Sequence, residues 1–265
     1  MRTSLIVTTY NRPDALHIVL QSIVHQSQLP DEIVIADDGS DDETRKVIAN
    51  VQNTCKTPLV HAWQEDLGFR AARVRNLAAS KARGNYLIFI DGDMILHPRF
   101  IASHVKSARS GHMLHGKRAM LTQRMTNRIL RNKQYRISPF ATGITLRRYA
   151  FHIDPLVNII SYFSEDWYDT QLANLSLWKE DLIAVNGFNE DFTGWGREDS
   201  ELALRLTRNR LRKLELRFCA VAFHLAHGKD NKNKNPASLE RNQKLLEHSI
   251  ESGIIRCENG IDKHF

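Results

Sequence analysis

Short apolar stretches alternate with amphipathic segments over the first 90 residues, and this alternation most constrains the fold. Four stretches are brief, rich in β-branched and other apolar residues and bounded by polar turns, as strands are. Between them, apolar residues recur every three or four positions, as on one face of a helix. The expected strands are 4–9, 32–36, 59–63 and 86–90, and the expected helices are 15–24, 42–51 and 71–82. This order predicts an α/β fold with a mostly parallel central sheet flanked by helices.

Two acidic turns follow strands of this expected sheet. Asp37 and Asp38 come after the second strand, and Asp91 and Asp93 come after the fourth. Ligands of open α/β sheets bind at the carboxyl ends of the strands, where both turns are expected. Two carboxylates separated by one residue can bind one divalent cation, or divide between a metal and a ribose. The alternative is an ordinary polar turn, but the coincidence of two such turns favours a functional site.

The segment 187–199 combines glycines, aromatic residues and acids. Glycines on both sides of Trp195 let the backbone bend while the indole stays accessible, and an indole can cover the apolar face of a sugar. Glu198 and Asp199 can accept hydrogen bonds from sugar hydroxyls. The alternative is that these two acids only stabilise the start of a helix. That alternative leaves the paired glycines unexplained.

The pattern is less regular after residue 100. The basic segment 117–136 predicts no particular element. Elsewhere, helices are expected at 100–110, 179–185, 198–207 and 236–252, and strands at 172–177 and 221–224. His224 closes the last of these strands, and His227 follows it. A single histidine is more often structural than a ligand, although neutral imidazole binds Mn²⁺ well beside carboxylates.

Together these residues resemble glycosyltransferase family 2, whose members have the GT-A fold. The segments that resemble the nucleotide-binding half of that family are 4–11, 37–40 and 91–93. The segments that resemble the acceptor half, shared with animal galactosyltransferases and bacterial chondroitin-type polymerases, are 174–176, 187–188 and 194–199. The resemblance implies a single domain. Residues 1–100 would be its nucleotide-sugar-binding half and 101–265 its acceptor-binding and catalytic half, with a C-terminal helical annex from about 236.

The resemblance also implies a role for each matching residue. The residues expected near the nucleotide are Thr8, Tyr10, Asp38, Arg75, Asn76 and Asp91. Those expected to bind Mn²⁺ or Mg²⁺ are Asp93 and His224, with His227 as the alternate ligand. Those expected to bind the acceptor are Trp195, Arg197 and Glu198, and Asp199 would be the catalytic base. The family has Tyr where Phe223 precedes the expected metal ligand.

The function implied is an inverting, metal-dependent glycosyltransferase. It would move a hexose or N-acetylhexosamine from a UDP-sugar to a carbohydrate acceptor, lipid-linked acceptors included, during synthesis of a surface polysaccharide such as capsule or lipopolysaccharide. A nucleotidyltransferase that makes sugar nucleotides is one alternative. It normally begins with a Gly-rich phosphate loop, whereas residues 1–11 contain no glycine. A non-catalytic glycan- or membrane-binding module is the other, and it does not explain why the acidic turns and Glu198-Asp199 occur together.

The positive charge of the chain is concentrated in one segment. The formal net charge is +7, but residues 94–153 hold twelve Lys or Arg and no Asp or Glu. Such a segment can face an anionic membrane surface, a lipid-pyrophosphate acceptor or an acidic glycan. It can also be a solvated basic surface. Since no nucleic-acid-binding motif accompanies it, we do not expect a nucleic-acid partner.

Cysteine usage and hydropathy lead to an expected location. Cys55, Cys219 and Cys257 are few and widely spaced, which suits a reducing compartment. No apolar run approaches the ~18 residues that cross a bilayer. Residues 1–13 also lack the apolar region of a secretory signal. We therefore expect a cytoplasmic protein that associates peripherally with the inner face of the cell membrane.

Overall fold

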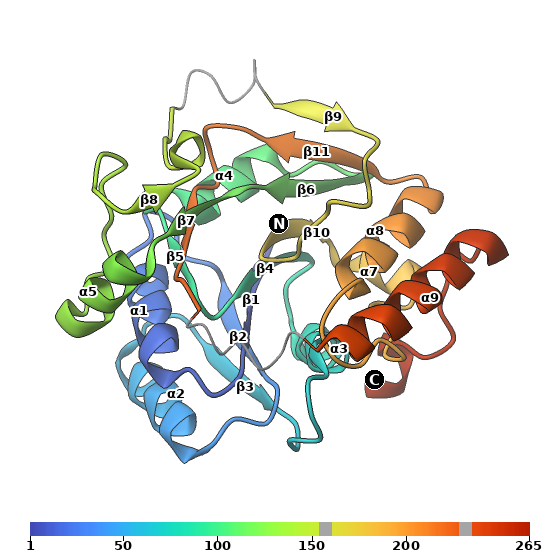
Figure 1. Ribbon diagram of the computed structural model, residues 1–265, viewed down its shortest axis with the longest axis horizontal. Coiled ribbons are helices and arrows are strands. Elements are labelled where there is room, and N and C mark those ends of the chain that lie inside the picture. Colours follow the sequence, from blue (N-terminus) through green and yellow to red (C-terminus); the bar gives the residue numbers. More distant parts are fainter. Residues whose placement is uncertain (154–160, 228–234) are drawn as a thin grey trace.

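A computed structural model describes residues 1–153, 161–227 and 235–265 of the chain. It is an α/β fold in which a twisted central sheet carries helices on both faces (Figure 1). A smaller second sheet lies beside it. The expected α/β class with a flanked central sheet is confirmed.

The central sheet has eight strands in the order β3-β2-β1-β4-β10-β6-β11-β9. Its strands are β1 (Thr3–Thr9), β2 (Glu32–Asp37), β3 (Leu59–Trp63), β4 (Tyr86–Asp91), β6 (His112–Gly116), β9 (Tyr162–Ser164), β10 (Asn174–Trp178) and β11 (Arg212–Leu216). The first four of these in sequence are mutually parallel. β10 is antiparallel to both of its neighbours, β6 and β11 are parallel, and β9 is an antiparallel edge strand. The sheet is therefore parallel in its N-terminal half and mixed beyond β4.

The second sheet has four short strands in the order β5-β12-β7-β8. They are β5 (Met94–Leu96), β7 (Arg118–Leu121), β8 (Ile144–Thr145) and β12 (Ala222–His224). β12 runs between β5 and β7, antiparallel to the first and parallel to the second. This sheet joins the segment after Asp93 to the segment that ends at His224, although the two are far apart in the sequence.

The helices cover both faces of the central sheet. They are α1 (Pro13–Val24), α2 (Asp42–Thr54), α3 (Ala71–Lys81), α4 (Phe100–Ser107), α5 (Gln123–Asn132), α7 (Lys179–Ala184), α8 (Glu198–Arg208) and α9 (Pro236–Ser252), with short 3-10 helices η1 (Arg147–Tyr149) and η3 (Ile261–His264). Side-chain caps start several of them. For example, the side chain of Asp41 accepts a hydrogen bond from the Thr44 amide, and that of Thr122 accepts one from the Met125 amide.

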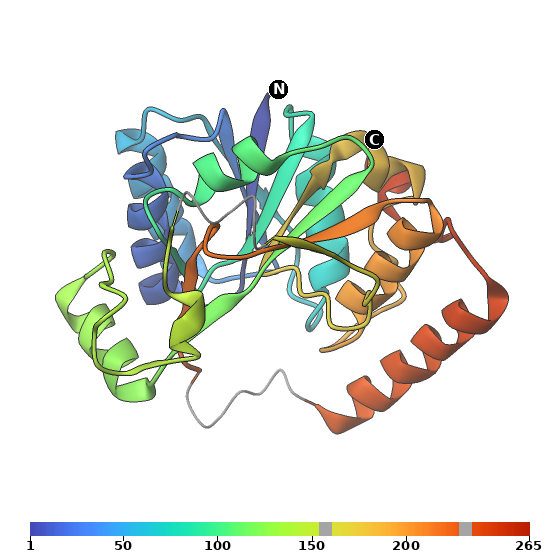
Figure 2. The same ribbon diagram turned by 90° about the horizontal axis from the view of Figure 1, so that it is seen from above.

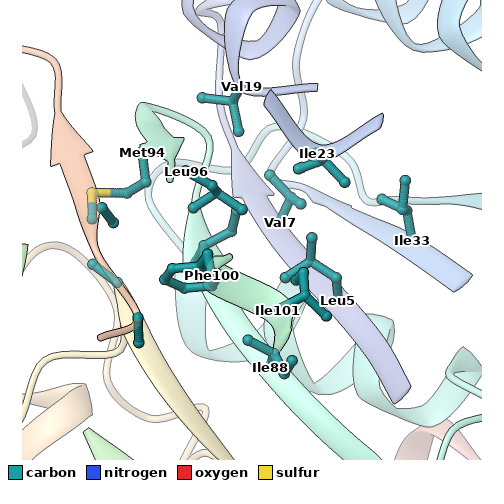
Figure 3. Close-up of a cluster of buried hydrophobic side chains, with 14 of the residues drawn as sticks. Leu5, Val7, Val19, Ile23, Ile33, Ile88, Met94, Leu96, Phe100 and Ile101 are labelled. Carbon is teal, nitrogen blue, oxygen red and sulfur yellow. The ribbon is translucent and has the colours of Figure 1, made fainter. Parts of the chain in front are cut away.

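Two apolar layers, one on each face of the sheet, stabilise the fold. Alternate residues of a strand point to opposite faces. Leu5 and Val7 therefore pack against α1, where Val19 and Ile23 meet them (Figure 3). Ile6 belongs instead to the layer formed with α3, α7 and α8. This double coverage explains why the strands of the N-terminal half read as continuous apolar runs.

The expected elements of the first 100 residues are confirmed to within a few residues. The expected strand 59–63 and helix 236–252 coincide with β3 and α9. The expected helix 100–110 is too long, because the backbone becomes extended at Ala108 and α4 ends at Ser107. The segment 117–136, for which no element is expected, contains β7 and α5. Among the described residues, no helix combines the length and apolar character that a bilayer span requires.

Candidate active site

A cleft of about 420 Å³ opens at the carboxyl ends of β1 and β4. It lies between the parallel half of the sheet and the segment that leads into α8. Eleven of the residues named from the sequence line it, namely Thr8, Tyr10, Asp38, Arg75, Asp91, Asp93, Trp195, Arg197, Glu198, Asp199 and the alternate metal ligand His227. The strand ends and the segment 195–199, which are remote in sequence, therefore share one cavity.

The strand register places the second acidic turn against the end of β1. Thr8 and Asp91 are direct neighbours across the β1–β4 pair. The amide of Gly92 donates a 2.7 Å hydrogen bond to the Thr8 carbonyl oxygen. A Cβ at position 92 would lie only 3.0 Å from that oxygen. Glycine at position 92 therefore lets the turn lie against β1, and Asp91 and Asp93 flank this glycine.

Arg75 connects the two halves of the cleft. Its guanidinium lies 3.3 Å from Asp91, 3.4 Å from Glu198 and 3.2 Å from Asp199. Its Nε also donates to the Thr8 hydroxyl oxygen at 3.3 Å. Burial acts to lower the pKa of Arg75, but the surrounding carboxylates of Asp199, Asp91 and Glu198 raise it above the ordinary value. One permanently charged side chain thus holds three carboxylates together.

Asp93 lies in a cluster of side chains suited to a divalent cation. Its carboxylate is 3.6 Å from His224 Nε2 and 3.1 Å from His227 Nε2. Ligand atoms of the three residues all lie within 4.8 Å of one another. Asp93 Oδ1 is buried and makes no hydrogen bond. A carboxylate oxygen without a partner beside two imidazoles fits a metal ion of the Mn²⁺ class.

The second sheet is the reason why the two histidines reach Asp93. His224 pairs with Met94 in the antiparallel ladder between β12 and β5, which directly follows Asp93. The Leu225 amide then donates a 3.0 Å hydrogen bond to the Asp93 carbonyl oxygen. The sequence names His224 as the expected ligand and His227 as the alternate. The structure brings both to Asp93.

The charges around Asp93 favour its ionised form. Burial alone would raise the pKa of Asp93, but His224, His227 and Arg12 outweigh it and hold that pKa at about 2. Burial lowers the pKa of His224 to about 4, against the attraction of Asp93. At neutral pH the pair is therefore a carboxylate and a neutral imidazole, the protonation states in which both bind a metal.

The part of the cleft formed by β1 and β2 carries Tyr10 and Asp38. The Tyr10 hydroxyl donates to Asp66 at 2.9 Å. One oxygen of Asp38 accepts a hydrogen bond from the Gln64 side chain at 2.5 Å, and the other accepts one from the Arg70 amide at 2.8 Å. Burial raises the pKa of Asp38 to about 6 in spite of these bonds. This end of the cleft therefore offers an aromatic ring beside a carboxylate whose position is fixed.

The opposite part of the cleft is aromatic. Trp195 is 36% exposed. Gly194 and Gly196 flank it, with φ of +73° and +108°. A Cβ at Gly196 would meet the Leu239 side chain at 2.8 Å, so glycine lets α9 approach this loop. Arg197 places its guanidinium over the Tyr168 ring, 4.5 Å from the centroid. Trp195 and Tyr168 thus present exposed rings in the part of the cleft that also contains Glu198 and Asp199.

Glu198 and Asp199 start α8 and differ in their surroundings. Burial and then the charge of Asp199 raise the pKa of Glu198 to about 7, although Arg75 acts in the opposite direction. The side chain of Asp199 is 23% exposed. Its Oδ2 accepts a 3.0 Å hydrogen bond from the Leu172 amide. Asp199 is therefore held from both sides, by Arg75 and by the backbone, while part of it faces the cleft.

Asn76 lies outside the cleft, contrary to the sequence-based expectation. It is fully buried, and its amide nitrogen donates to the Phe188 carbonyl oxygen at 2.8 Å and to Glu190 at 2.9 Å. Its amide oxygen accepts from the Phe188 amide at 2.8 Å. Asn76 therefore joins α3 to the loop 187–190. The expectation failed because a residue beside Arg75 on a helix points in a different direction.

Several residues that line the cleft escaped sequence reasoning. They are Arg12, Phe69, Arg118, Tyr168, Asp169 and Leu239. Arg12 donates to Asp93 at 3.2 Å and lies 3.2 Å from His227 Nδ1. Its position just after the first strand, in the Asn-Arg-Pro turn, was a usable signal. Tyr168 and Asp169 carried no comparable signal because they lie in an irregular segment.

Comparison with family models gives two matches that together span most of the chain. The model described as glycosyl transferase family 2 matches residues 4–169, more than half of the chain. The model described as N-terminal domain of galactosyltransferase matches residues 157–228. The first match contains the segments 4–11, 37–40 and 91–93, and the second contains the segments 174–176, 187–188 and 194–199.

Individual relatives agree with these matches. Validoxylamine A glucosyltransferase of Streptomyces hygroscopicus subsp. limoneus is 30% identical over 221 residues, covering 77% of this chain and 47% of the relative. Chondroitin synthase of Escherichia coli is 26% identical over 267 residues, covering 93% of this chain and 38% of the relative. This chain thus spans less than half the length of either protein.

A solved structure supports the same fold. The crystal structure of S. aureus TarS 1-349 in complex with UDP-GlcNAc has a TM-score of 0.65 at 18% identity. The match covers 94% of this chain and 66% of that one. At this identity the likeness shows the fold alone, and it confirms the expected GT-A architecture.

Proposed function

The chain belongs to glycosyl transferase family 2, and we propose that it transfers a hexose or N-acetylhexosamine from a UDP-sugar to a carbohydrate acceptor, with inversion and with a divalent metal. The donor class is supported by TarS, whose structure contains UDP-GlcNAc. A carbohydrate acceptor is supported by the chondroitin synthase relative, and synthesis of a surface polysaccharide is our proposal for the process served. Because this chain covers less than half of either relative, the activity of the whole relatives comes to this chain only as a proposal.

The observation that carries the proposal is the position of Arg75. It contacts Asp91, at the end of β4, and Asp199, at the start of α8, with the same guanidinium. The nucleotide side and the acceptor side of the cleft are therefore only one side chain apart. A sugar held between them would have the acceptor hydroxyl near Asp199 and the diphosphate near Asp93.

We assign Asp199 as the catalytic base. The acceptor oxygen would attack the anomeric carbon as the bond from that carbon to the diphosphate oxygen breaks, and UDP would leave. The hydroxyl proton would pass to Asp199. Attack opposite the leaving group inverts the anomeric configuration. Arg75 and the Leu172 amide fix the carboxylate in place, and such positioning contributes much of the rate.

Neighbouring side chains would hold the reactants. Glu198 would bind the acceptor by hydrogen bonding. Trp195, with Arg197, would contact the face of the acceptor sugar. Tyr10, Asp38, Thr8 and Asp91 would bind the uridine. Arg75 would hold the neighbouring carboxylates in position and would not bind the nucleotide itself. The exposure of Trp195 beside the buried Glu198 fits a site that is open to a large acceptor.

Asp93, His224 and His227 would hold the metal. The unpartnered Asp93 Oδ1 and the two neighbouring imidazoles fit Mn²⁺, with Mg²⁺ as the second candidate. When bound, such an ion neutralises negative charge that develops on the departing diphosphate. Arg12 lies against Asp93 and would supply further positive charge on the same side.

A donor screen combined with one substitution tests the proposal. The chain is incubated with Mn²⁺ and individual UDP-sugars, and slow release of UDP is measured with and without candidate acceptors. Asp199→Asn should fold normally and bind UDP, but lose at least ~10²-fold in transfer rate. Asp42→Asn makes the same chemical change on the exposed surface of α2 and should leave the rate unchanged.

Two outcomes would contradict the assignment. Near-normal transfer by Asp199→Asn would remove Asp199 from the role of base. Release of pyrophosphate from a nucleoside triphosphate, with no turnover of any UDP-sugar, would instead indicate a nucleotidyltransferase.

A further inference from the structure

Residues 122–149, which we call the basic arm, project from the fold at one end. The arm consists of α5, a loop, β8 and η1. α5 and the loop after it lie at the periphery, on the side of the molecule away from α9 (Figures 1 and 2). Part of the basic segment 94–153 therefore lies on this projecting arm.

The arm carries seven Lys or Arg residues and no acidic residue of its own. Arg124, Arg128 and Arg131 are exposed, and their spacing of four and three residues places them on one face of α5. Met125 and Ile129 lie on the opposite face and are buried. α5 is therefore a cationic helix whose apolar side is already used within the fold.

A large aromatic residue stands out from the loop of the arm. Phe140 is 76% exposed, more than any other large apolar residue described. Its ring packs edge-on against Phe151, with the centroids 5.6 Å apart. Arg147 donates hydrogen bonds to the carbonyl oxygens of Pro139, at 2.7 Å, and of Ala141, at 3.0 Å. The loop is thus ordered in a way that presents the ring to solvent.

The arm is firmly connected to the candidate metal site. β7 runs from Arg118, which lines the cleft, to Leu121, and α5 begins directly after it. At about 3.3 Å per residue, the start of α5 lies within ~17 Å of Arg118. The Thr126 hydroxyl oxygen also accepts a 2.9 Å hydrogen bond from the Ala226 amide, between the two histidines. Whatever binds the arm is therefore held close to the cleft.

We propose that the basic arm docks the protein on an anionic phospholipid bilayer. Arg124, Arg128 and Arg131 contact lipid phosphates, and Phe140 enters the headgroup region. Cations attract the arm to an anionic surface, and an aromatic side chain at the interface adds the apolar contact that stable peripheral binding requires. Docking in this way places the cleft beside acceptors carried on membrane lipids. That last statement rests on the proposed function, whereas the docking itself does not.

Cosedimentation with lipid vesicles tests the docking. The full chain should bind vesicles that contain phosphatidylglycerol, bind those of pure phosphatidylcholine weakly, and detach at high salt. Replacing Arg124, Arg128 and Arg131 together by Gln should weaken binding about 100-fold. Phe140→Ser should weaken it several-fold at every salt concentration. Thermal unfolding should be unchanged in the arginine variant, whose altered side chains are exposed, and should change little in Phe140→Ser, which loses only the edge contact with Phe151.

A matched control removes the same charge elsewhere. Lys56, Lys81 and Arg83 are exposed on the nucleotide half, and changing all three to Gln should leave vesicle binding unchanged. Asp199→Asn should also bind vesicles normally, which separates this test from that of the enzymatic activity. Equal losses in the control, or binding that ignores lipid charge, would overturn the proposal. So would tight binding of a soluble acidic glycan or nucleic acid by a chain that ignores vesicles.

Discussion

The guanidinium of Arg75 lies 3.2 Å from a carboxylate oxygen of Asp199, and the two residues are 124 positions apart in the sequence. Arg75 comes from α3, which packs on β1 and β2, and Asp199 comes from the first turn of α8. Since the same guanidinium reaches Asp91, it connects the end of β4 to the start of α8 across the cleft. The candidate site therefore depends on one buried cation.

Replacing Arg75 by Gln should affect both stability and activity. The change leaves Asp91, Glu198 and Asp199 close together without a compensating charge. Breaking a buried ion pair by removing one partner costs about 3–5 kcal/mol. We expect a comparable loss in the free energy of unfolding, measured with urea, and at least ~10²-fold slower transfer at a temperature where the variant is folded. Lys81→Gln, at the exposed end of the same helix, is the control and should be neutral.

The conservative variant separates charge from geometry. Arg75→Lys keeps the positive charge but cannot reach three carboxylates with a planar group. It should recover more of the unfolding free energy than of the transfer rate. If Lys restored both equally, the bridging geometry would have no importance.

Removal of metal ligands should reveal whether both histidines act. We expect chelation by EDTA to stop transfer and added Mn²⁺ to restore it. His224→Ala and His227→Ala should each weaken Mn²⁺ binding at least ~10-fold, because each imidazole lies next to the Asp93 carboxylate. Calorimetric titration with Mn²⁺ in the presence of UDP measures this. His248→Ala alters an exposed histidine on α9 and should have no effect. Full Mn²⁺ affinity in either site variant would exclude that residue as a ligand.

The fold was predictable where residue periodicity was strong. Leu5, Ile6 and Val7 point alternately into the two apolar layers, and the regularly spaced apolar residues of α1 are buried as well. α5 was missed because its short sequence is mostly polar and only Met125 and Ile129 indicate a buried side. β5 has only three residues, too few for a periodic signal. The expected strand 221–224 does correspond to β12. β5 pairs with β12, and β12 pairs with β7 as well.

The candidate site was predictable where a motif lies at the end of a strand. Asp91 and Asp93 stood out in this way, and the segment 194–199 stood out by composition. Arg12 follows the first strand, but it was missed because its contact with Asp93 spans 81 positions. Asn76 was expected near the nucleotide because of its position in the sequence, but the structure buries it. Its neighbour Arg75 faces the cleft, but burial against Phe188 is a tertiary property that sequence proximity does not reveal.

The structural role of Asn76 leads to a prediction that differs from a nucleotide-binding role. Asn76→Ala leaves the amide and carbonyl groups of Phe188 buried without a partner. Each such group costs about 1–3 kcal/mol. We expect the free energy of unfolding to fall by about 2–4 kcal/mol, while the affinity of the folded variant for UDP stays unchanged. Urea unfolding and UDP titration at low temperature measure these quantities, with the exposed Asn53→Ala as control. Normal stability with weakened UDP binding would return Asn76 to the nucleotide site.

Ionisation of Glu198 should lower the free energy of unfolding of the chain as the pH rises. Burial and the charge of Asp199 raise the pKa of Glu198 from 4.5 to about 7. The folded state therefore holds this proton more tightly than the unfolded state. The contribution of Glu198 to the free energy of unfolding is highest below pH 4.5, falls as the pH rises, and reaches its minimum above about pH 7.

Glu198→Gln cannot ionise, so it should lose this pH dependence. Relative to the unsubstituted chain, its free energy of unfolding should increase by up to about 3 kcal/mol between acidic and mildly alkaline pH. Urea unfolding on both sides of neutrality measures the difference, and the exposed Glu43→Gln should show none. The variant should also transfer sugar more slowly, because an amide cannot accept hydrogen bonds as a carboxylate does. A stability difference that is equal at both pH values would mean that Glu198 ionises normally, and that the crowding of Asp199, Arg75 and Glu198 does not strain the site.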